Sequence, residues 1–157
     1  MPTELIIQVN GKPHPVQAAP DTPLLYVLRN ELGLNGPQFG CGLEQCGSCM
    51  VLLGAQAAYS CRTPVSDIGN TPITTLEGLS EDGELHPLQR AFIEQQAAQC
   101  GYCINGMLIS AAALLQRNAH PSDEQIRAAL ERNLCRCGVH LRILRAVRRA
   151  AEMLAEE

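Results

Sequence analysis

Eight cysteines in a chain of 157 residues are the feature that most limits how this protein can fold. They form two sets of four. The first set is a C-x4-C-x2-C run with one further cysteine: Cys41, Cys46, Cys49 and Cys61. The second set is a C-x2-C and a C-x-C: Cys100, Cys103, Cys135 and Cys137. The N-terminus shows no export signal, so we expect a cytoplasmic, reducing compartment, where clustered cysteines more often bind metal than form disulfides.

The first set has the ligand spacing of plant-type [2Fe–2S] ferredoxins. Its loop is rich in glycine, and Gly40, Gly42 and Gly47 stand beside the cysteines. At such positions the backbone can bend tightly and point its N–H groups at sulfur. A zinc site or two disulfides are the alternatives. Structural zinc sites usually present two short C-x2–4-C knuckles, so this spacing favours iron and sulfur.

The second set lies between predicted helices, at residues 98–104 and 133–140. A helix N-terminus offers free N–H groups and a positive dipole end, which suits an anionic cluster. Taken alone, this set leaves both metals open, because four thiolates also bind zinc.

The first half of the chain predicts a β-grasp pattern. Residues 4–10 and 14–18 form candidate strands around an Asn-Gly-Lys turn, and a helix follows at 24–32. In that helix Pro23 takes the first position and Gly33 ends it. Three further short strands are expected at 50–53, 57–60 and 71–76.

After a polar linker at 77–86 the chain is predicted to be helical. Helices are expected at 87–98, at 104–118, from a capping box at Ser122 and Gln125, and at 140–155. We therefore predict an α+β protein: an N-terminal β-grasp [2Fe–2S] ferredoxin-like domain at 1–78, then an all-α four-helix [2Fe–2S]-binding domain at 79–157.

The remaining composition mainly excludes functions. The formal charge is −4, which argues against a general nucleic-acid binder. The longest apolar stretch, residues 107–115, is too short for a transmembrane segment. The sequence contains no dinucleotide or P-loop glycine motif, and no nucleophile set remains once the cysteines are assigned to metal. We expect no substrate-binding catalytic site of its own.

Several motifs together resemble a known family. GPQFGCGLEQCGSCMV, QCGYCINGM and NLCRCGVHLRI are similar to the small iron–sulfur subunit of molybdenum hydroxylases, the xanthine oxidase family. The resemblance extends over roughly residues 4–150. Within the family, LNGPQFGCGL and CRCGVHLRIL look most like the small subunits of nicotinate dehydrogenases and, less closely, of isoquinoline 1-oxidoreductases.

The resemblance implies an electron-transfer subunit holding two [2Fe–2S] clusters. The Cys41, Cys46, Cys49 and Cys61 set would bind the cluster far from molybdenum. The Cys100, Cys103, Cys135 and Cys137 set would bind the near one. Gln99 and Cys137 would contact molybdopterin, in its cytosine dinucleotide form, held by a large partner subunit. That partner would hydroxylate an N-heteroaromatic such as nicotinate, and the electrons would pass to a cytochrome c or flavoprotein acceptor.

Other functions are also considered. Within the family, the chain could serve an aldehyde, isoquinoline or purine oxidoreductase. Outside it, a stand-alone two-cluster ferredoxin would purify without a partner, and a zinc-binding module would be colourless. Any membrane association is expected to be peripheral, through partner subunits.

Overall fold

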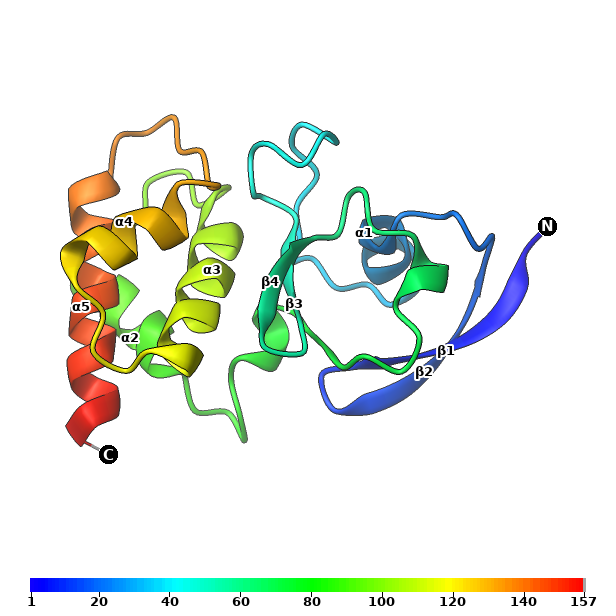
Figure 1. Cartoon of the computed structure of the whole chain (residues 1–157), viewed down its shortest axis with the longest axis horizontal. Coiled ribbons are helices and arrows are strands. Elements are labelled where there is room, and N and C mark those ends of the chain that lie inside the picture. The colour runs from blue at the N-terminus through cyan, green and yellow to red at the C-terminus, as the bar shows by residue number, and fades with distance from the viewer. Residues whose placement is uncertain (157) are drawn as a thin grey trace.

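A computed structural model describes residues 1–156 as two lobes side by side, one built on a sheet and one on helices (Figure 1). The strands are β1 (Thr3–Val9), β2 (Lys12–Ala18), β3 (Met50–Leu53), β4 (Gln56–Tyr59) and β5 (Ile73–Thr74). The α-helices are α1 (Leu24–Tyr26), α2 (Pro87–Glu94), α3 (Ile104–Arg117), α4 (Asp123–Leu130) and α5 (His140–Glu156). Short η elements are η1 (Val27–Glu31), η2 (Val65–Asp67) and η3 (Leu76–Gly78).

The sheet confirms the predicted β-grasp architecture. Its strand order is β2-β1-β5-β3-β4, with β1 parallel to β5 and the other neighbours antiparallel. Asn10 and Gly11 turn the first hairpin at φ values of 50° and 77°, which is the left-handed geometry that an Asn-Gly turn supplies. Alternation places Ile7 and Val9 inside the lobe. The sheet therefore has one buried face, against which the segment after β2 packs.

The segment predicted as one α-helix at 24–32 forms a different type of helix over most of its length. Only one turn, α1, is α-helical, and η1 is a π-helix in which Leu32 N–H donates to the Val27 carbonyl at 3.2 Å. Pro23 remains extended and pairs with Pro64, so it precedes the helix instead of opening it. The segment buries side chains in two directions: Leu28 joins the sheet core and Leu25 joins the core shared with the helices.

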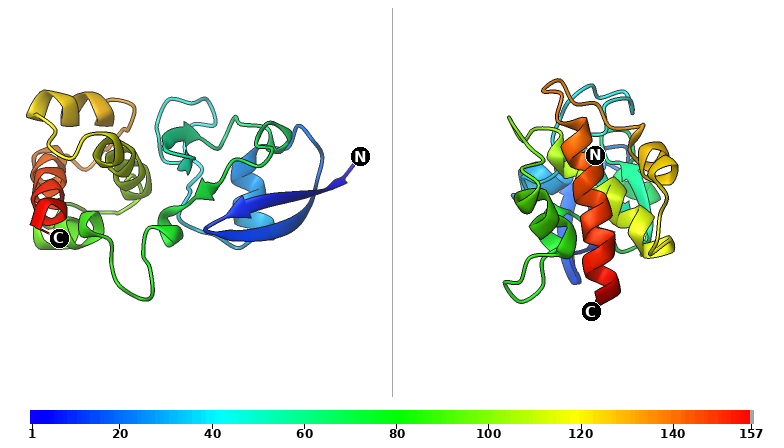
Figure 2. Two further views of the ribbon diagram at one scale, coloured as in Figure 1. Left: turned by 60° about the horizontal axis from the view of Figure 1, so that its bottom comes forward. Right: turned by 90° about the vertical axis from the view of Figure 1, so that its left-hand side faces the viewer.

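The helical lobe has the four predicted helices. α3 is buried on most sides and packs against β3 and β4 (Figure 2). The capping box of Ser122 and Gln125 at the start of α4 is confirmed. Arg148 of α5 holds Asp123 of α4 through an N–O contact of 2.5 Å. In residues 1–156, no helix is long and apolar enough to cross a membrane.

The first of these helices is shorter than predicted, because α2 ends at Glu94 and not at residue 98. Gln96 adopts φ 50°, Ala97 N–H donates to Phe92 O, and Gln96 N–H donates to Ile93 O. This pair of bonds is the Schellman arrangement that closes a helix with a left-handed residue. The early stop releases the segment that carries Cys100.

Replacing Gln96 by glycine should stabilise the protein by about 1 kcal/mol, because glycine enters the left-handed region without steric cost. The melting temperature should rise by roughly 2–4 °C. Gln95→Gly is the matched control: Gln95 has φ −85°, so glycine there gains nothing and should lower the melting temperature. A lower melting temperature for Gln96→Gly would contradict this account of the helix end.

The apolar interior forms two clusters. One lies within the sheet lobe and contains Ile7 and Leu28. The other crosses between the lobes, because Met50 and Leu52 of β3 pack in the same cluster as Leu88 of α2 and Met107 of α3. The lobes are thus joined by a continuous apolar core, and the loops bearing the cysteines lie along one edge of it.

Candidate metal centres

The first cysteine set is assembled by the hairpin of β3 and β4. Cys49 directly precedes β3 and Cys61 follows β4 by two residues. Because Met50 is paired with Tyr59, the hairpin brings these two cysteines close, and both are buried. Cys41 and Cys46 come from the irregular loop before β3 and are half-buried.

Backbone N–H groups surround the outer sulfurs of this set. Leu43 and Gln45 donate to Cys41 Sγ at 3.2 and 3.3 Å, and Cys41 N–H donates to Cys46 Sγ at 3.4 Å. Partial burial works to raise the pKa of Cys41, but the N–H groups of Leu43, Gln45 and Cys46, together with the Cys46 thiol, outweigh it and lower the pKa to about 7. The thiolate is the metal-binding form, so the loop already favours the ligand state at Cys41.

The inner sulfurs have the opposite environment. Burial raises the pKa of Cys49 to about 12, and the neighbouring Cys61 and Cys46 thiols add to the shift. A methyl group at Gly40 would lie 2.5 Å from Cys46 Sγ, so the predicted close approach of this glycine to a sulfur is present. A buried group of thiols needs a cationic centre before all its members can ionise together.

The second set stands at two helix starts. Cys103 is the residue before α3, and Cys135 and Cys137 precede α5. Burial raises the pKa of Cys103 to about 12, with further contributions from Cys135 and Cys100. Cys135 is also partly desolvated, but Cys103 and the N–H groups of residues 137–139 lower its pKa. Cys137 interacts with Cys100.

The second set is the more exposed one. Cys100 and the adjoining Gln99 are exposed, and Cys137 is half-buried. Figure 1 shows the loop of the first set and both loops of the second set along the same upper edge of the molecule. The structure therefore places Gln99, Cys100 and Cys137 at an accessible end of the second set.

The donors present suit iron–sulfur clusters. Each set supplies four thiols, and the electrostatic interactions among them stay within neighbours of the same set. Two foursomes of thiols with N–H donors aimed at sulfur are the ligand chemistry of [2Fe–2S] centres.

The two loops that carry the sets are joined through the backbone. Leu134 N–H, next to Cys135, donates to the carbonyl of Cys46 at 2.9 Å. Gly47 and Gly106 meet so closely that a methyl group on Gly106 would lie 2.1 Å from the Gly47 carbonyl oxygen. The sequence interpretation missed this joint. A signal was available, since a glycine inside a helix lowers the stability of that helix and is usually kept there for a packing reason.

Two buried asparagines line the same joint and were also missed. Asn105 donates to backbone carbonyls on either side of Cys49, and Asn133 donates to Ser110 Oγ at 2.8 Å. Tyr102, between two cysteines of the second set, donates to the Phe39 carbonyl in the loop of the first. Asparagine at such places has an ordinary packing role in most proteins, so sequence alone did not single out these two residues.

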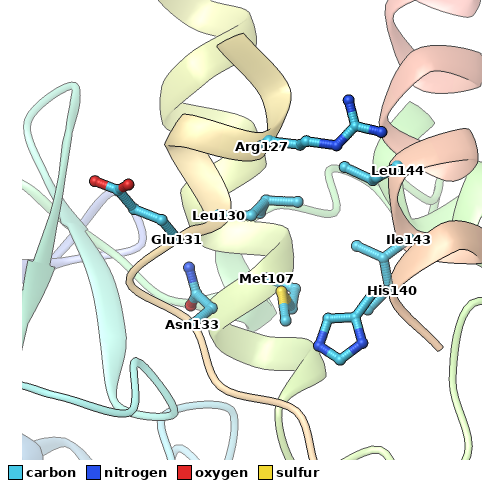
Figure 3. A pocket seen from close by; sticks show the side chains of 8 residues that line it. All are labelled: Met107, Arg127, Leu130, Glu131, Asn133, His140, Ile143 and Leu144. Carbon is cyan, nitrogen blue, oxygen red and sulfur yellow. The ribbon is translucent and has the colours of Figure 1, made fainter. Parts of the chain in front are cut away.

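A cavity of about 300 Å³ opens between α3, α4 and α5 (Figure 3). Met107, Leu130 and Ile143 give it a mainly aliphatic lining, and His140 and Arg127 stand among them. No cysteine lines this cavity. It therefore lies outside the candidate metal centres.

Fold and thiol arrangement define a class of protein that carries two iron–sulfur clusters, and comparison with known proteins agrees. Residues 7–68 match a family model described as a 2Fe-2S iron-sulfur cluster binding domain. Residues 75–148 match one described as a [2Fe-2S] binding domain. The prediction of a ferredoxin-type domain followed by a second [2Fe–2S] domain is confirmed.

Proteins of similar sequence and structure show which kind of two-cluster iron–sulfur protein this chain resembles. The chain is 59% identical to a nicotinate dehydrogenase subunit of Pseudomonas putida KT2440, over 97% of both chains. It is 49% identical to the alpha subunit of isoquinoline 1-oxidoreductase from Brevundimonas diminuta, covering 94% of this chain and 97% of the relative. A crystal structure of quinoline 2-oxidoreductase from Pseudomonas putida 86 superposes with a TM-score of 0.93 at 34% identity, covering 99% of this chain and 97% of that one.

The chain belongs to the small iron–sulfur subunits of the molybdenum hydroxylases, the xanthine oxidase family. It is an electron-transfer subunit of an oxidoreductase, and its family implies that the partner is a large molybdopterin-binding subunit.

Proposed function

We propose that this chain carries electrons from the molybdenum site of a nicotinate-hydroxylating partner subunit to an external acceptor. The observation that carries the electron-transfer role is the backbone joint between the two cysteine loops, at the hydrogen bond from Leu134 to Cys46. Electron transfer between two centres needs a fixed, short separation, and this bond ties a residue beside one ligand to another ligand. The support for nicotinate is the 59% identity to the Pseudomonas putida nicotinate dehydrogenase subunit over nearly the whole chain.

Ligand roles follow from the two sets. Cys41, Cys46, Cys49 and Cys61 would hold the cluster far from molybdenum. Cys100, Cys103, Cys135 and Cys137 would hold the near one. When bound, a [2Fe–2S] cluster takes up and releases one electron at a time. The chain contributes the N–H groups around the sulfurs and the burial of the inner thiols, and these set the reduction potentials.

The accessible end of the second set would face the large subunit. As the family resemblance implies, Gln99 and Cys137 would contact the pterin there, in its cytosine dinucleotide form. Both residues lie beside the exposed Cys100. The far cluster would deliver electrons to a cytochrome c or a flavoprotein. We also place the boundary of the two domains after Gly78, at the end of η3, and the complex in the cytoplasm, with any membrane contact made by partner subunits.

One alternative substrate has a specific observation behind it. The isoquinoline 1-oxidoreductase subunit is 49% identical over nearly the full chain, so an isoquinoline-type heteroaromatic is the second candidate. The role of this chain is the same for both candidate substrates, because its own residues would bind the two clusters and the partner subunit would bind the substrate.

Purification of the native complex through a tag on this chain tests the proposal. We expect a large molybdenum-containing chain to co-purify, with about four irons per small subunit from two [2Fe–2S] clusters. Nicotinate should reduce an artificial one-electron acceptor faster than isoquinoline, purines or aldehydes do. Isolation of this chain alone, or with zinc in place of iron, would refute the electron-transfer role. If isoquinoline gave the faster rate, the substrate would be that of the second candidate.

A further inference from the structure

Asn105 connects the two cysteine sets through its side chain. It lies two positions after Cys103, near the start of α3, and only 3% of its surface is exposed. Its Nδ2 donates to the Ser48 carbonyl at 2.9 Å and to the Met50 carbonyl at 3.1 Å. These two carbonyls stand immediately before and after Cys49. The Asn105 side-chain amide, on the helix that follows Cys103 of the second set, therefore binds the backbone on both sides of Cys49, a cysteine of the first set.

The orientation of this amide is fixed by its surroundings. Both neighbours are acceptors, so only the NH2 end can face them. Its other atom, Oδ1, is buried without a hydrogen-bond partner in the described residues 1–156. An unpaired buried acceptor is unfavourable, and an apolar side chain of the same size would avoid that penalty. What asparagine adds at this site is the pair of donated bonds.

We propose that Asn105 is a positioning residue that fixes Cys49 relative to Cys103, and thereby the spacing and orientation of the two clusters. The inference rests on the ligand sets of the proposed function. A peptide unit is planar, so holding the Ser48 carbonyl also fixes the direction of the Cys49 N–H on the same unit. The second bond holds the Met50 carbonyl. Because Cys49 lies between Ser48 and Met50, its backbone has little freedom to rotate.

The other contacts at the joint act elsewhere. Leu134 holds Cys46, and Gly106 packs on Gly47, so both contacts lie at the outer part of the loop. Asn105 acts on the inner, buried ligand. The Ser48 carbonyl also accepts from Gln38 N–H at 3.0 Å, so it keeps one partner when the amide is removed. A variant that lacks the amide should therefore fold while the link from α3 to the two peptide groups around Cys49 is lost.

The test uses the intact complex with both clusters, reduced anaerobically with dithionite and measured by electron paramagnetic resonance at low temperature. The dipolar interaction between two reduced clusters falls with the cube of their distance and depends on their orientation. In Asn105→Ala we expect loss of the native splitting from both cluster signals and a broadened far-cluster signal, while the near cluster keeps its own g values. Asn105→Asp keeps the shape but removes the NH2 donor, and should change the spectrum in the same direction.

Ile109→Val is the matched control, because Ile109 is fully buried on the same helix but further along it. It should lower the melting temperature and leave the splitting and the far-cluster signal as in the native complex. Selective loss of the far cluster in Asn105→Ala would also support the proposal.

Three results would overturn the proposal: native spectra in both Asn105 variants, the same spectral change in Ile109→Val, or failure of both clusters to load in both variants. The last would mean that Asn105 supports the whole fold. Failure of the proposed function is distinguishable, since the native complex would then lack two [2Fe–2S] signals.

Discussion

Cys103→Ser is expected to abolish turnover with an external acceptor while the far cluster remains. Cys103 is the buried member of the second set and stands at the start of α3, so its sulfur has a fixed place in the site. A serine hydroxyl ionises far less readily than a thiol and is a poor ligand for iron at neutral pH. Iron should fall from about four to about two per chain, because one of two [2Fe–2S] clusters is lost.

Iron analysis and electron paramagnetic resonance measure the cluster loss, and steady-state assays with an artificial acceptor measure the rate. Cys61→Ser is the matched variant, since Cys61 is similarly buried in the first set. It should remove the far signal and spare the near one. Unchanged steady-state rates in Cys103→Ser would be incompatible with a route through the second set.

Gly106→Ala should destabilise the protein by about 3 kcal/mol or more, through overpacking at the joint between the lobes. Helix propensity alone predicts the opposite sign, because alanine is favoured over glycine inside a helix by about 1 kcal/mol. The contact decides: the added methyl group would lie 2.1 Å from the Gly47 carbonyl oxygen and 2.6 Å from Asn133 Oδ1. Both are parts of packed backbone or buried side chain, so neither can move freely.

The melting temperature should fall by roughly 6–12 °C for a loss of that size. Gly54→Ala is the control, because its methyl group would meet nothing within 4 Å. Its φ of 59° alone should cost about 1 kcal/mol. If Gly106→Ala proved as stable as the native protein, the lobes would have room to separate and the joint would not be rigid.

Much of the architecture could be predicted from local patterns. Strand alternation, the Asn-Gly turn and the capping box of Ser122 depend on residues close in sequence, and the structure contains all three. Cysteine spacing is equally local: it favoured a [2Fe–2S] cluster at the first set and left the second set open between iron and zinc. The resemblance to the family supplied the second [2Fe–2S] domain, and the family models confirm both domains. The glycines beside the first set were informative for the same reason, because a ligand loop must bend around its sulfurs.

What could not be predicted depends on a rare local conformation or on contacts distant in sequence. The end of α2 depends on Gln96 taking a left-handed conformation, which glutamine rarely does. The π-helix at η1 serves a segment that must bury Leu25 and Leu28 in different cores. The joint between the cysteine loops joins residues more than fifty positions apart, such as Asn105 and Ser48, and no periodic pattern reveals such a pairing.

The apolar core that crosses between the lobes also bears on how such subunits can evolve. A ferredoxin module that is self-sufficient can be fused, swapped or recruited by gene shuffling without adjustment. Here Met50 and Leu52 of the sheet lobe pack against Leu88 and Met107 of the helical lobe. A sheet lobe transferred alone would therefore expose an apolar surface to solvent. Recombination between relatives should therefore exchange both lobes together. A substitution on one side of this apolar contact should be matched by a compensating substitution on the other.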